Sequence, residues 1–243
     1  MRLDVYGISQ KGSVRETNED AILTRTCDNA GLFLVADGIG GRAHGEIVSG
    51  MLRDGYDRWW NDTFLSKRYE LTFQEATESL KEVLIGLNQD VVSQFGESRA
   101  GSTLALLFLF DGNSLCLSAG DSRIYRSRHF SFRQMTRDDV YGNQPGCEKN
   151  GAKDKNIGKL LGAVGIRWTL DFSMRTDCSR SGDFWFLCSD GVYRFIRRGS
   201  MRWKLPLLGR LMATDRFVHR IESEVEKNGS GDNYSMIFIR VGE

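Results

Sequence analysis

Short apolar or alternating stretches recur along the chain, and turn-forming residues bound most of them. Residues 3–9 alternate between apolar and polar side chains, which is the period of a half-buried strand. The segment Phe110-Asp111-Gly112-Asn113 predicts a hairpin, because Asp-Gly favours the tight turn between antiparallel strands. The pattern as a whole predicts strands at residues 3–9, 32–36, 103–110, 115–119, 123–126, 184–188 and 234–241.

Three longer segments carry apolar residues at the 3.6-residue spacing of an amphipathic helix. They are residues 46–60, 72–95 and 215–227. In the second, Thr72 and Glu75 stand three residues apart, so each side chain can bond the backbone amide of the other in a capping box. In the third, Asn228-Gly229 follows the last periodic position and predicts the end of the helix.

The order of these elements predicts the fold class. Two consecutive helices separate blocks of strands, whereas a doubly wound parallel sheet alternates strands with helices. A mainly antiparallel α+β arrangement covered by helices fits better, and residues 1–243 are expected to form one domain, because no linker-like stretch interrupts them. Two regions fit no element. Residues 137–159 are polar and long enough to form a functional flap, and residues 194–210 are strongly basic.

Composition and charge exclude several classes of protein. The chain has 243 residues, 40% of them hydrophobic, and a formal net charge of +1. Such a chain has no overall field that would attract nucleic acid or an anionic membrane. No apolar run approaches the roughly 18–20 residues of a membrane helix, and the first residues lack the apolar core of a signal peptide. A cytoplasmic protein without a transmembrane segment is therefore expected.

The five cysteines and three histidines predict little chemistry. No two cysteines have CxxC spacing, and Cys116 and Cys188 fall in apolar runs, which favours core packing over disulfides or zinc. His44, His129 and His219 are well separated, so an imidazole metal site or a Ser/His/Asp triad is poorly supported.

Three aspartates far apart in sequence lie at the edges of predicted strands. Asp37-Gly38 ends one apolar run, Asp190-Gly191 ends another, and Asp232 directly precedes the last strand. Each alone is an ordinary turn residue. Together they predict a site for a hard cation such as Mg²⁺ or Mn²⁺, which prefers carboxylate, carbonyl and water oxygens. A glycine after the aspartate lets the backbone approach the ion.

Seven segments of the chain resemble, in the same order, the metal-dependent protein phosphatases of type 2C, particularly the compact bacterial members. Residues 15–20 of the first segment, taken alone, would be interpreted as a solvated turn, because charged residues are mostly exposed. The set spans almost the whole chain and is specific as a series. It consists of GSVRETNED (12–20), VADGIGG (35–41), GST (101–103), AGDSRIY (119–125), LLG (160–162), CSDGV (188–192) and GSGDNYS (229–235).

The resemblance implies two stacked antiparallel β-sheets flanked by helices, and hydrolysis of phosphoserine and phosphothreonine with two Mn²⁺ or Mg²⁺ ions. It implies that the ions share an activated water that attacks phosphorus in line with the leaving oxygen. It also implies a role for each matching residue. Asp37 would bridge both ions, the Gly38 carbonyl would bind one of them, and Asp190 and Asp232 would hold the second, with Glu19 and Asp20 close by. Arg15 would hold the substrate phosphate, Asp121 would help to hold a third and weaker ion, and Asn233 would orient Asp232 or a water.

The chain departs from the family pattern at two positions. Ile39 stands where many eukaryotic relatives have a histidine proposed as general acid, so the source of the leaving-group proton is open. Arg194 stands where an acidic or small residue is usual. The basic stretch 194–210 that begins there is interpreted as a solvated surface packed through a few apolar residues, with docking to an acidic partner or a membrane as the alternative.

The main alternative to an active phosphatase is a pseudophosphatase that binds phosphoproteins without turnover. Loss of a metal ligand would favour it, but Asp37, Asp190 and Asp232 are all present. A regulatory phosphatase for an anti-sigma-factor-type partner shares the chemistry and differs only in substrate. The resemblance further implies phosphorylated protein substrates and a cognate Ser/Thr kinase, and a monomer is the default expectation.

Overall fold

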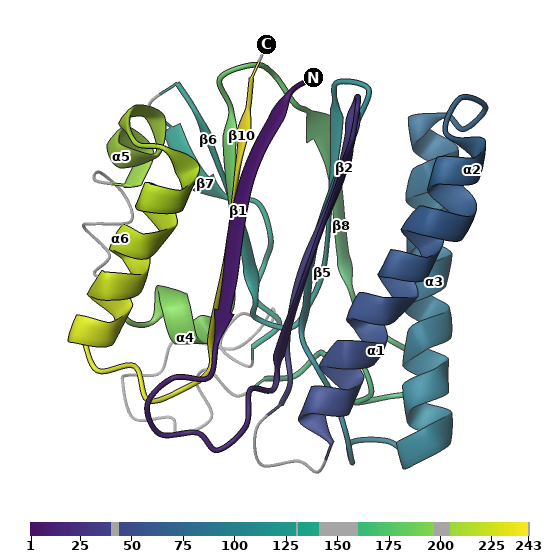
Figure 1. The fold of residues 1–243 in the computed structure, drawn as a ribbon. Helices are drawn as coiled ribbons and strands as arrows, with labels where there is room; N and C mark the ends of the chain where they lie inside the picture. Colours follow the sequence, from purple (N-terminus) through teal and green to yellow (C-terminus); the bar gives the residue numbers. More distant parts are fainter. Residues whose placement is uncertain (40–43, 130, 141–159, 197–204, 243) are drawn as a thin grey trace, which may run out of the picture.

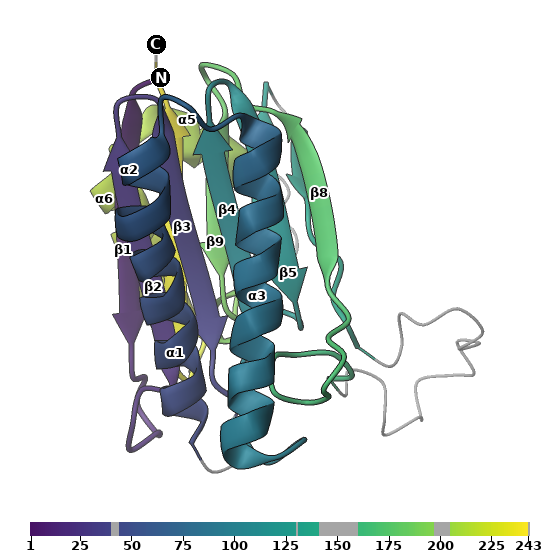
Figure 2. The same ribbon diagram turned by 90° about the vertical axis from the view of Figure 1, so that its right-hand side faces the viewer.

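The computed structural model describes residues 1–39, 44–129, 131–140, 160–196 and 205–242, and it confirms the predicted α-β-β-α sandwich. Two five-stranded antiparallel sheets stack face to face, with helices on the outer face of each (Figure 1 and Figure 2). The first sheet contains, in spatial order, β1 (Leu3–Gln10), β10 (Tyr234–Val241), β9 (Phe184–Cys188), β6 (Arg123–Arg128) and β7 (Ser131–Gln134). The second contains β2 (Asp20–Cys27), β3 (Ala30–Asp37), β4 (Leu104–Phe110), β5 (Asn113–Ala119) and β8 (Ser173–Cys178).

Helices from two parts of the chain cover the two sheets (Figure 1). The second sheet is covered by α1 (Gly45–Arg58), the π-helical turn η1 (Trp59–Phe64), α2 (Leu65–Lys67) and α3 (Phe73–Phe95). The first sheet is covered by α4 (Asp190–Tyr193), α5 (Leu205–Leu211) and α6 (Thr214–Lys227). The predicted capping box is present at α3: Glu75 N–H donates to Thr72 Oγ1 at 3.2 Å, and Thr72 N–H donates to Glu75 Oε2 at 2.9 Å.

The hydrophobic core has three layers that follow from this stacking. Between the sheets, Phe33 and Trp185 are fully buried. Under α6, the rings of Phe217 and Phe238 lie with centroids 4.3 Å apart. Because the alternating side chains of β3 and β10 point to opposite faces, these central strands contribute to an outer layer and to the inter-sheet layer. The two sheets are thereby joined into one sandwich.

The helix predicted at residues 46–60 continues beyond its expected end. The polar residues 61–63 break the 3.6-residue pattern, but the π-helical turn shifts the register so that Phe64 faces the core beside Trp60, with ring centroids 4.8 Å apart. Phe64 also meets Phe108 of β4 edge-on at 5.3 Å. The predicted hairpin between β4 and β5 is confirmed, and both of its turn residues have positive φ, 49° at Asp111 and 73° at Gly112.

Strands β2, β7 and β8 were not predicted from the sequence. Strand β8 lies at the edge of its sheet and is largely exposed, so it has no apolar alternation to mark it. Strand β7 has four residues, too few for a periodic signal. Residues 141–159 of the expected flap and 197–204 of the basic stretch lie outside the described residues.

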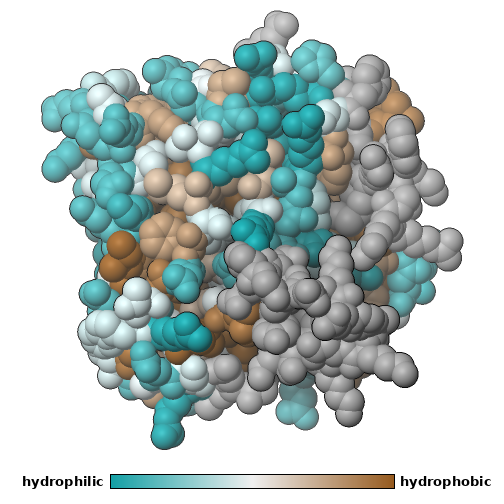
Figure 3. Space-filling model, turned by 180° about the vertical axis from the view of Figure 1, so that it is seen from behind, coloured by the Kyte–Doolittle hydropathy of each residue, from teal (hydrophilic) through white to brown (hydrophobic). Residues whose placement is uncertain are grey.

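Other expectations concern the surface and the cysteines. Cys116 and Cys188 are buried and free, in agreement with the predicted core role. Within the described part of the chain, no helix has the length and apolar character needed to cross a bilayer. The rear face of the molecule intersperses hydrophilic and hydrophobic residues (Figure 3).

Candidate active site

The carboxylates that the sequence places at strand ends meet at one end of the sandwich. Asp20 opens β2, Asp37 closes β3, and the two are direct partners in the antiparallel register. Asp190 begins α4 directly after β9, and Asp232 precedes β10. Helix α4 and the beginning of β10 lie at the lower end of the sheets in Figure 1. Asp121 follows β5. Its charge acts on Asp37 at this end, as do the charges of Asp20, Asp190 and Asp232.

The backbone of Asp37 is fixed by two residues to which the sequence assigned no role. Asp37 N–H donates to Thr103 Oγ1 at 3.0 Å, and the Asp37 carbonyl accepts from Thr103 N–H at 2.8 Å. Ser102 Oγ donates to the same carbonyl at 3.0 Å. Both side chains are buried. The 101–103 segment therefore holds the central carboxylate in place, and only its match to the family series pointed to it.

Gly38 lies where two other segments approach the backbone closely. Its N–H donates to the Glu19 carbonyl at 3.1 Å, and Ser49 Oγ donates to the same carbonyl at 2.6 Å. A Cβ added at Gly38 would stand 2.6 Å from the carbonyl carbon of Gly45 and 2.7 Å from the Glu19 carbonyl oxygen. A glycine is required here by this close approach. Ile39 follows, and Gly40 and Gly41 of the motif lie outside the described residues.

Burial and mutual repulsion raise the pKa values of the central carboxyls. Burial is the main cause that raises the pKa of Asp20 to about 7, although Ser189 Oγ donates to its Oδ2 at 2.9 Å and opposes the shift. Burial, followed by the charges of Asp20 and Asp190, raises the pKa of Asp37 well above its usual range. Burial also raises the pKa of Asp190, and Arg194 opposes that shift. The site thus crowds acids in a partly buried position, which favours their neutral form in the absence of a cation.

Arg15 stands at the rim of this carboxylate cluster. Its Nε lies 2.8 Å from Asp232 Oδ1, and both side chains are partly exposed. An ion pair this exposed contributes little stability. The guanidinium is therefore free to exchange Asp232 for another anion without a large energetic cost.

Asn233 holds the segment that carries Arg15. Its Oδ1 accepts from Glu19 N–H at 3.0 Å, and its Nδ2 donates to the carbonyls of Lys11 at 2.7 Å and Thr17 at 2.9 Å. Its backbone N–H donates to Asp232 Oδ1 at 2.9 Å. The Asn233 side chain thus uses its hydrogen bonds on the 11–19 segment. The Asn233 backbone N–H is the group that orients Asp232. These three side-chain bonds join residues more than 200 positions apart, and no local sequence signal predicts them.

Asp121 contacts two residues that the sequence did not predict as its partners. Tyr193 Oη donates to Asp121 Oδ2 at 3.0 Å, and Arg194 Nη2 lies 3.5 Å from the same oxygen. Arg194 Nη1 lies 2.9 Å from Asp190 Oδ2. The first residue of the basic stretch therefore contacts the carboxylate cluster and is more than a solvated surface charge.

Divalent cations fit this arrangement. Asp20 Oδ1 is buried with no hydrogen-bond partner, and the charges of Asp37 and Asp190 repel each other when no cation separates them. Among the described residues, no three His, Cys, Asp or Glu side chains are grouped closely enough to form a metal-ligand set. Instead, Arg15 forms an ion pair with Asp232, and Arg194 forms one with Asp190.

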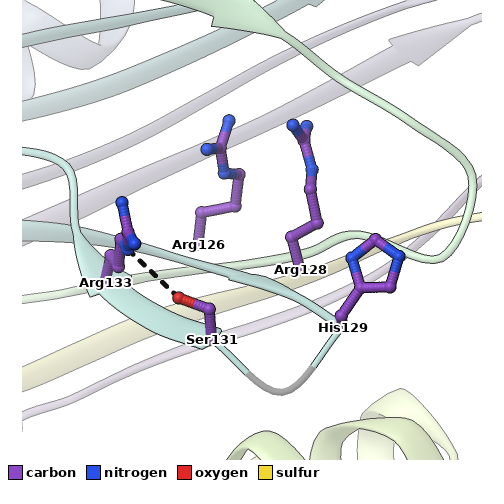
Figure 4. Close-up of a pocket in the computed structure, with 5 residues that line it drawn as sticks. All are labelled: Arg126, Arg128, His129, Ser131 and Arg133. Carbon is purple, nitrogen blue, oxygen red and sulfur yellow. Dashed lines mark hydrogen bonds between the residues drawn. The ribbon is translucent and has the colours of Figure 1, made fainter.

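A polar hollow lies away from these strand ends. It has a volume of about 500 Å³ and lies along β6 and β7 (Figure 4). Two of its three arginines pair with acids: Arg126 with Asp177 at 2.9 Å and Arg128 with Asp183 at 2.7 Å. These pairs are more buried than the pair of Arg15 and Asp232, so replacing the acid by a phosphate group costs more here than at the rim. The lining residues of the hollow are Arg126, Arg128, His129, Ser131 and Arg133.

Similarity to known proteins extends over nearly the whole chain. The chain is 27% identical over 245 residues to the serine/threonine phosphatase stp of Listeria monocytogenes, an alignment that covers 95% of this chain and 93% of that protein. The similar curated proteins are named serine/threonine phosphatases, in agreement with the type 2C resemblance that the motifs predict. No protein-family model matches the chain.

Solved structures of other bacterial proteins share the fold. PppA, described as a key regulatory component of T6SS in Pseudomonas aeruginosa, superimposes with a TM-score of 0.77 at 26% identity, over 99% of this chain and 98% of that one. The catalytic domain of the serine/threonine phosphatase PstP, solved with two manganese ions, superimposes with a TM-score of 0.79 at 20% identity, over 99% of both chains. At that identity the second comparison shows the common fold alone.

Proposed function

We propose that residues 1–243 form one catalytic domain that hydrolyses phosphoserine and phosphothreonine in proteins, with two Mn²⁺ or Mg²⁺ ions at the carboxylate cluster. The observation that carries this proposal is the half-buried Asp37 carboxyl, paired in register with Asp20 and close to other acids, since acids crowded in this way are stable as carboxylates only beside cations. The naming of similar proteins as serine/threonine phosphatases supports the same activity.

Most of the predicted site residues have a part in this proposal. Asp37, Asp190 and Asp232, with the carbonyl of Gly38, would hold the ions. Glu19 and Asp20 would assist directly or through waters. When bound, the ions supply Lewis acidity, which acidifies water and offsets charge on the phosphoryl group.

The protein residues around the ions supply position and charge. Asn233 and the backbone of Gly38 hold the 11–19 segment, so Arg15 is presented at the rim in a fixed register. A guanidinium binds phosphate through two parallel hydrogen bonds. Once Asp232 serves a divalent ion, Arg15 is free to grip the substrate phosphate and stabilise the charge that develops on it. No ionisable side chain stands at Ile39, and the proton for the leaving oxygen is assigned to water.

The test is Mn²⁺-dependent hydrolysis of p-nitrophenyl phosphate and of a phosphothreonine peptide. The wild type is expected to turn over both, and Asp37→Asn is expected to lose turnover and Mn²⁺ affinity. Asp111→Asn is the matched control, because this exposed turn residue undergoes the same change of charge and asparagine tolerates its positive φ.

Three outcomes decide between the proposals. Absence of metal-dependent turnover in a wild type that still binds the phosphopeptide means a pseudophosphatase. Absence of both turnover and binding refutes the phosphatase site altogether. Full activity in Asp37→Asn removes that residue from its bridging role. A cognate kinase, a cytoplasmic location and a monomeric state remain part of the proposal.

A further inference from the structure

Arg194 stands between two carboxylates of the proposed metal centre. It caps the short helix α4, four residues after Asp190, so its side chain turns back over the strand end. Nη1 lies 2.9 Å from Asp190 Oδ2, and Nη2 lies 3.5 Å from Asp121 Oδ2. One guanidinium therefore spans an acid that follows β5 and an acid that follows β9.

The position of Asp121 is built from residues of the fold. It is only 7% exposed, and Tyr193 Oη donates to it at 3.0 Å. The Tyr193 ring lies under the guanidinium of Arg123, 3.5 Å from the ring centroid, and Arg123 pairs with Asp138 at 2.6 Å. These contacts fix Asp121 so that its Oδ2, the oxygen bonded by Tyr193, also faces Arg194.

Charge balance at the site fits two divalent ions when Arg194 is in place. Two guanidinium groups, of Arg15 and Arg194, offset two of the six carboxylates, and the remaining four negative charges equal the charge of two divalent ions. A third ion beside Arg194 would leave an excess of positive charge in a partly buried site, which is unfavourable. The six carboxylates are Glu19, Asp20, Asp37, Asp121, Asp190 and Asp232.

We propose that Arg194 is a built-in cation that fills the space between Asp190 and Asp121, so that this chain takes two divalent ions and excludes a third. The inference rests on the proposed phosphatase function, and it replaces the third-ion role that the family resemblance implies for Asp121. Removing the guanidinium creates an additional site for a divalent ion. Asp121 then changes from the partner of an arginine to a metal ligand.

The test is the number of Mn²⁺ ions bound per chain, measured by isothermal titration calorimetry and by the electron paramagnetic resonance signal of free Mn²⁺. The wild type is expected to bind two ions, and Arg194→Met, which keeps the length but not the charge, is expected to bind three. Arg194→Met with Asp121→Asn is expected to return to two. Arg216→Met, a change of the same type on the exposed face of α6, is the control and is expected to bind two.

The outcomes separate this inference from the proposed function. A wild type that binds no Mn²⁺ refutes the metal site itself. A wild type that binds three ions, or Arg194→Met that binds two, overturns the role of Arg194 alone. Asp121→Asn in the wild-type background adds a test that does not depend on folding of the arginine variant. Unchanged binding of two ions supports the inference, and loss of an ion from that variant overturns it.

Discussion

Replacement of Asn233 by alanine tests whether one amide holds the phosphate-binding segment. The change removes three hydrogen bonds, one to Glu19 N–H and two to the carbonyls of Lys11 and Thr17. At about 1 kcal/mol each, and with some backbone groups regaining water, the free energy of unfolding should fall by about 2–4 kcal/mol. If about 1.4 kcal/mol of this loss falls on ordering of the Arg15 segment, the KM for a phosphothreonine peptide rises about tenfold.

Asn88 provides a matched control for this experiment. It is 1% exposed, its Nδ2 donates to the carbonyls of Arg167 and Trp168 at 3.0 Å, and its Oδ1 accepts from Gly165 N–H at 2.8 Å. Asn88→Ala therefore loses the same three kinds of bond from a different segment. Urea denaturation should show similar destabilisation in both variants, and steady-state kinetics should show the rise in KM only for Asn233→Ala.

Two results would refute this reasoning. A destabilisation of Asn233→Ala below about 0.5 kcal/mol would mean that the three bonds contribute little net free energy. A KM that is unchanged, or that rises equally in Asn88→Ala, would mean that Asn233 stabilises the fold without positioning Arg15.

Two further predictions concern the metal-free site and its backbone. Because burial raises the pKa of Asp20 to about 7, the folded metal-free protein holds a proton there that the unfolded chain releases near pH 4. Stability should therefore fall as pH rises from about 4 to about 7, and the contribution of Asp20 alone is at most about 1.4 kcal/mol per unit. Urea denaturation with chelator at several pH values measures this, and an Asp20→Asn variant with an equal slope would contradict it. Gly38→Ala places a Cβ against the backbone of Gly45 and Glu19, so it should lower stability by about 1–3 kcal/mol and weaken Mn²⁺ binding. Gly50→Ala, which meets nothing within 4 Å inside α1, should leave Mn²⁺ binding unchanged and raise stability by about 0.5–1 kcal/mol, and equal thermal midpoints for the two variants would contradict the steric argument.

Helices and hairpins were predictable where their signals are local. The capping box at Thr72 and the Asp111-Gly112 turn each depend on residues within a few positions. Strand β8 was not predictable, because it is an edge strand with exposed side chains and depends on β5 for its hydrogen bonds. The continuation of α1 was also missed, since a π-helical turn returns Phe64 to the core against the regular period.

In the candidate site, too, the residues with a local sequence signal were predictable and those that depend on tertiary packing were not. Asp37, Asp190 and Asp232 were predictable because an acid at the end of an apolar run needs no knowledge of its neighbours. Their meeting at one end of the sandwich depends on sheet pairing; the common position at strand ends suggested it, and the family resemblance added a role for each residue. The contacts of Asn233 and Arg194 depend on tertiary packing of distant segments, so the sequence showed Arg194 only as a departure from the family pattern.

The position of β10 has a consequence for biosynthesis. This strand is the last in sequence, yet it lies inside the first sheet between β1 and β9, with Leu3 opposite Val241. Asp232 and the amide that anchors the Arg15 segment immediately precede it. On a translating ribosome, the first strand must wait for more than 200 residues before its partner emerges, and contacts this far apart in sequence form slowly. The carboxylate cluster is therefore completed last, and a nascent or prematurely terminated chain lacks the activity proposed for it.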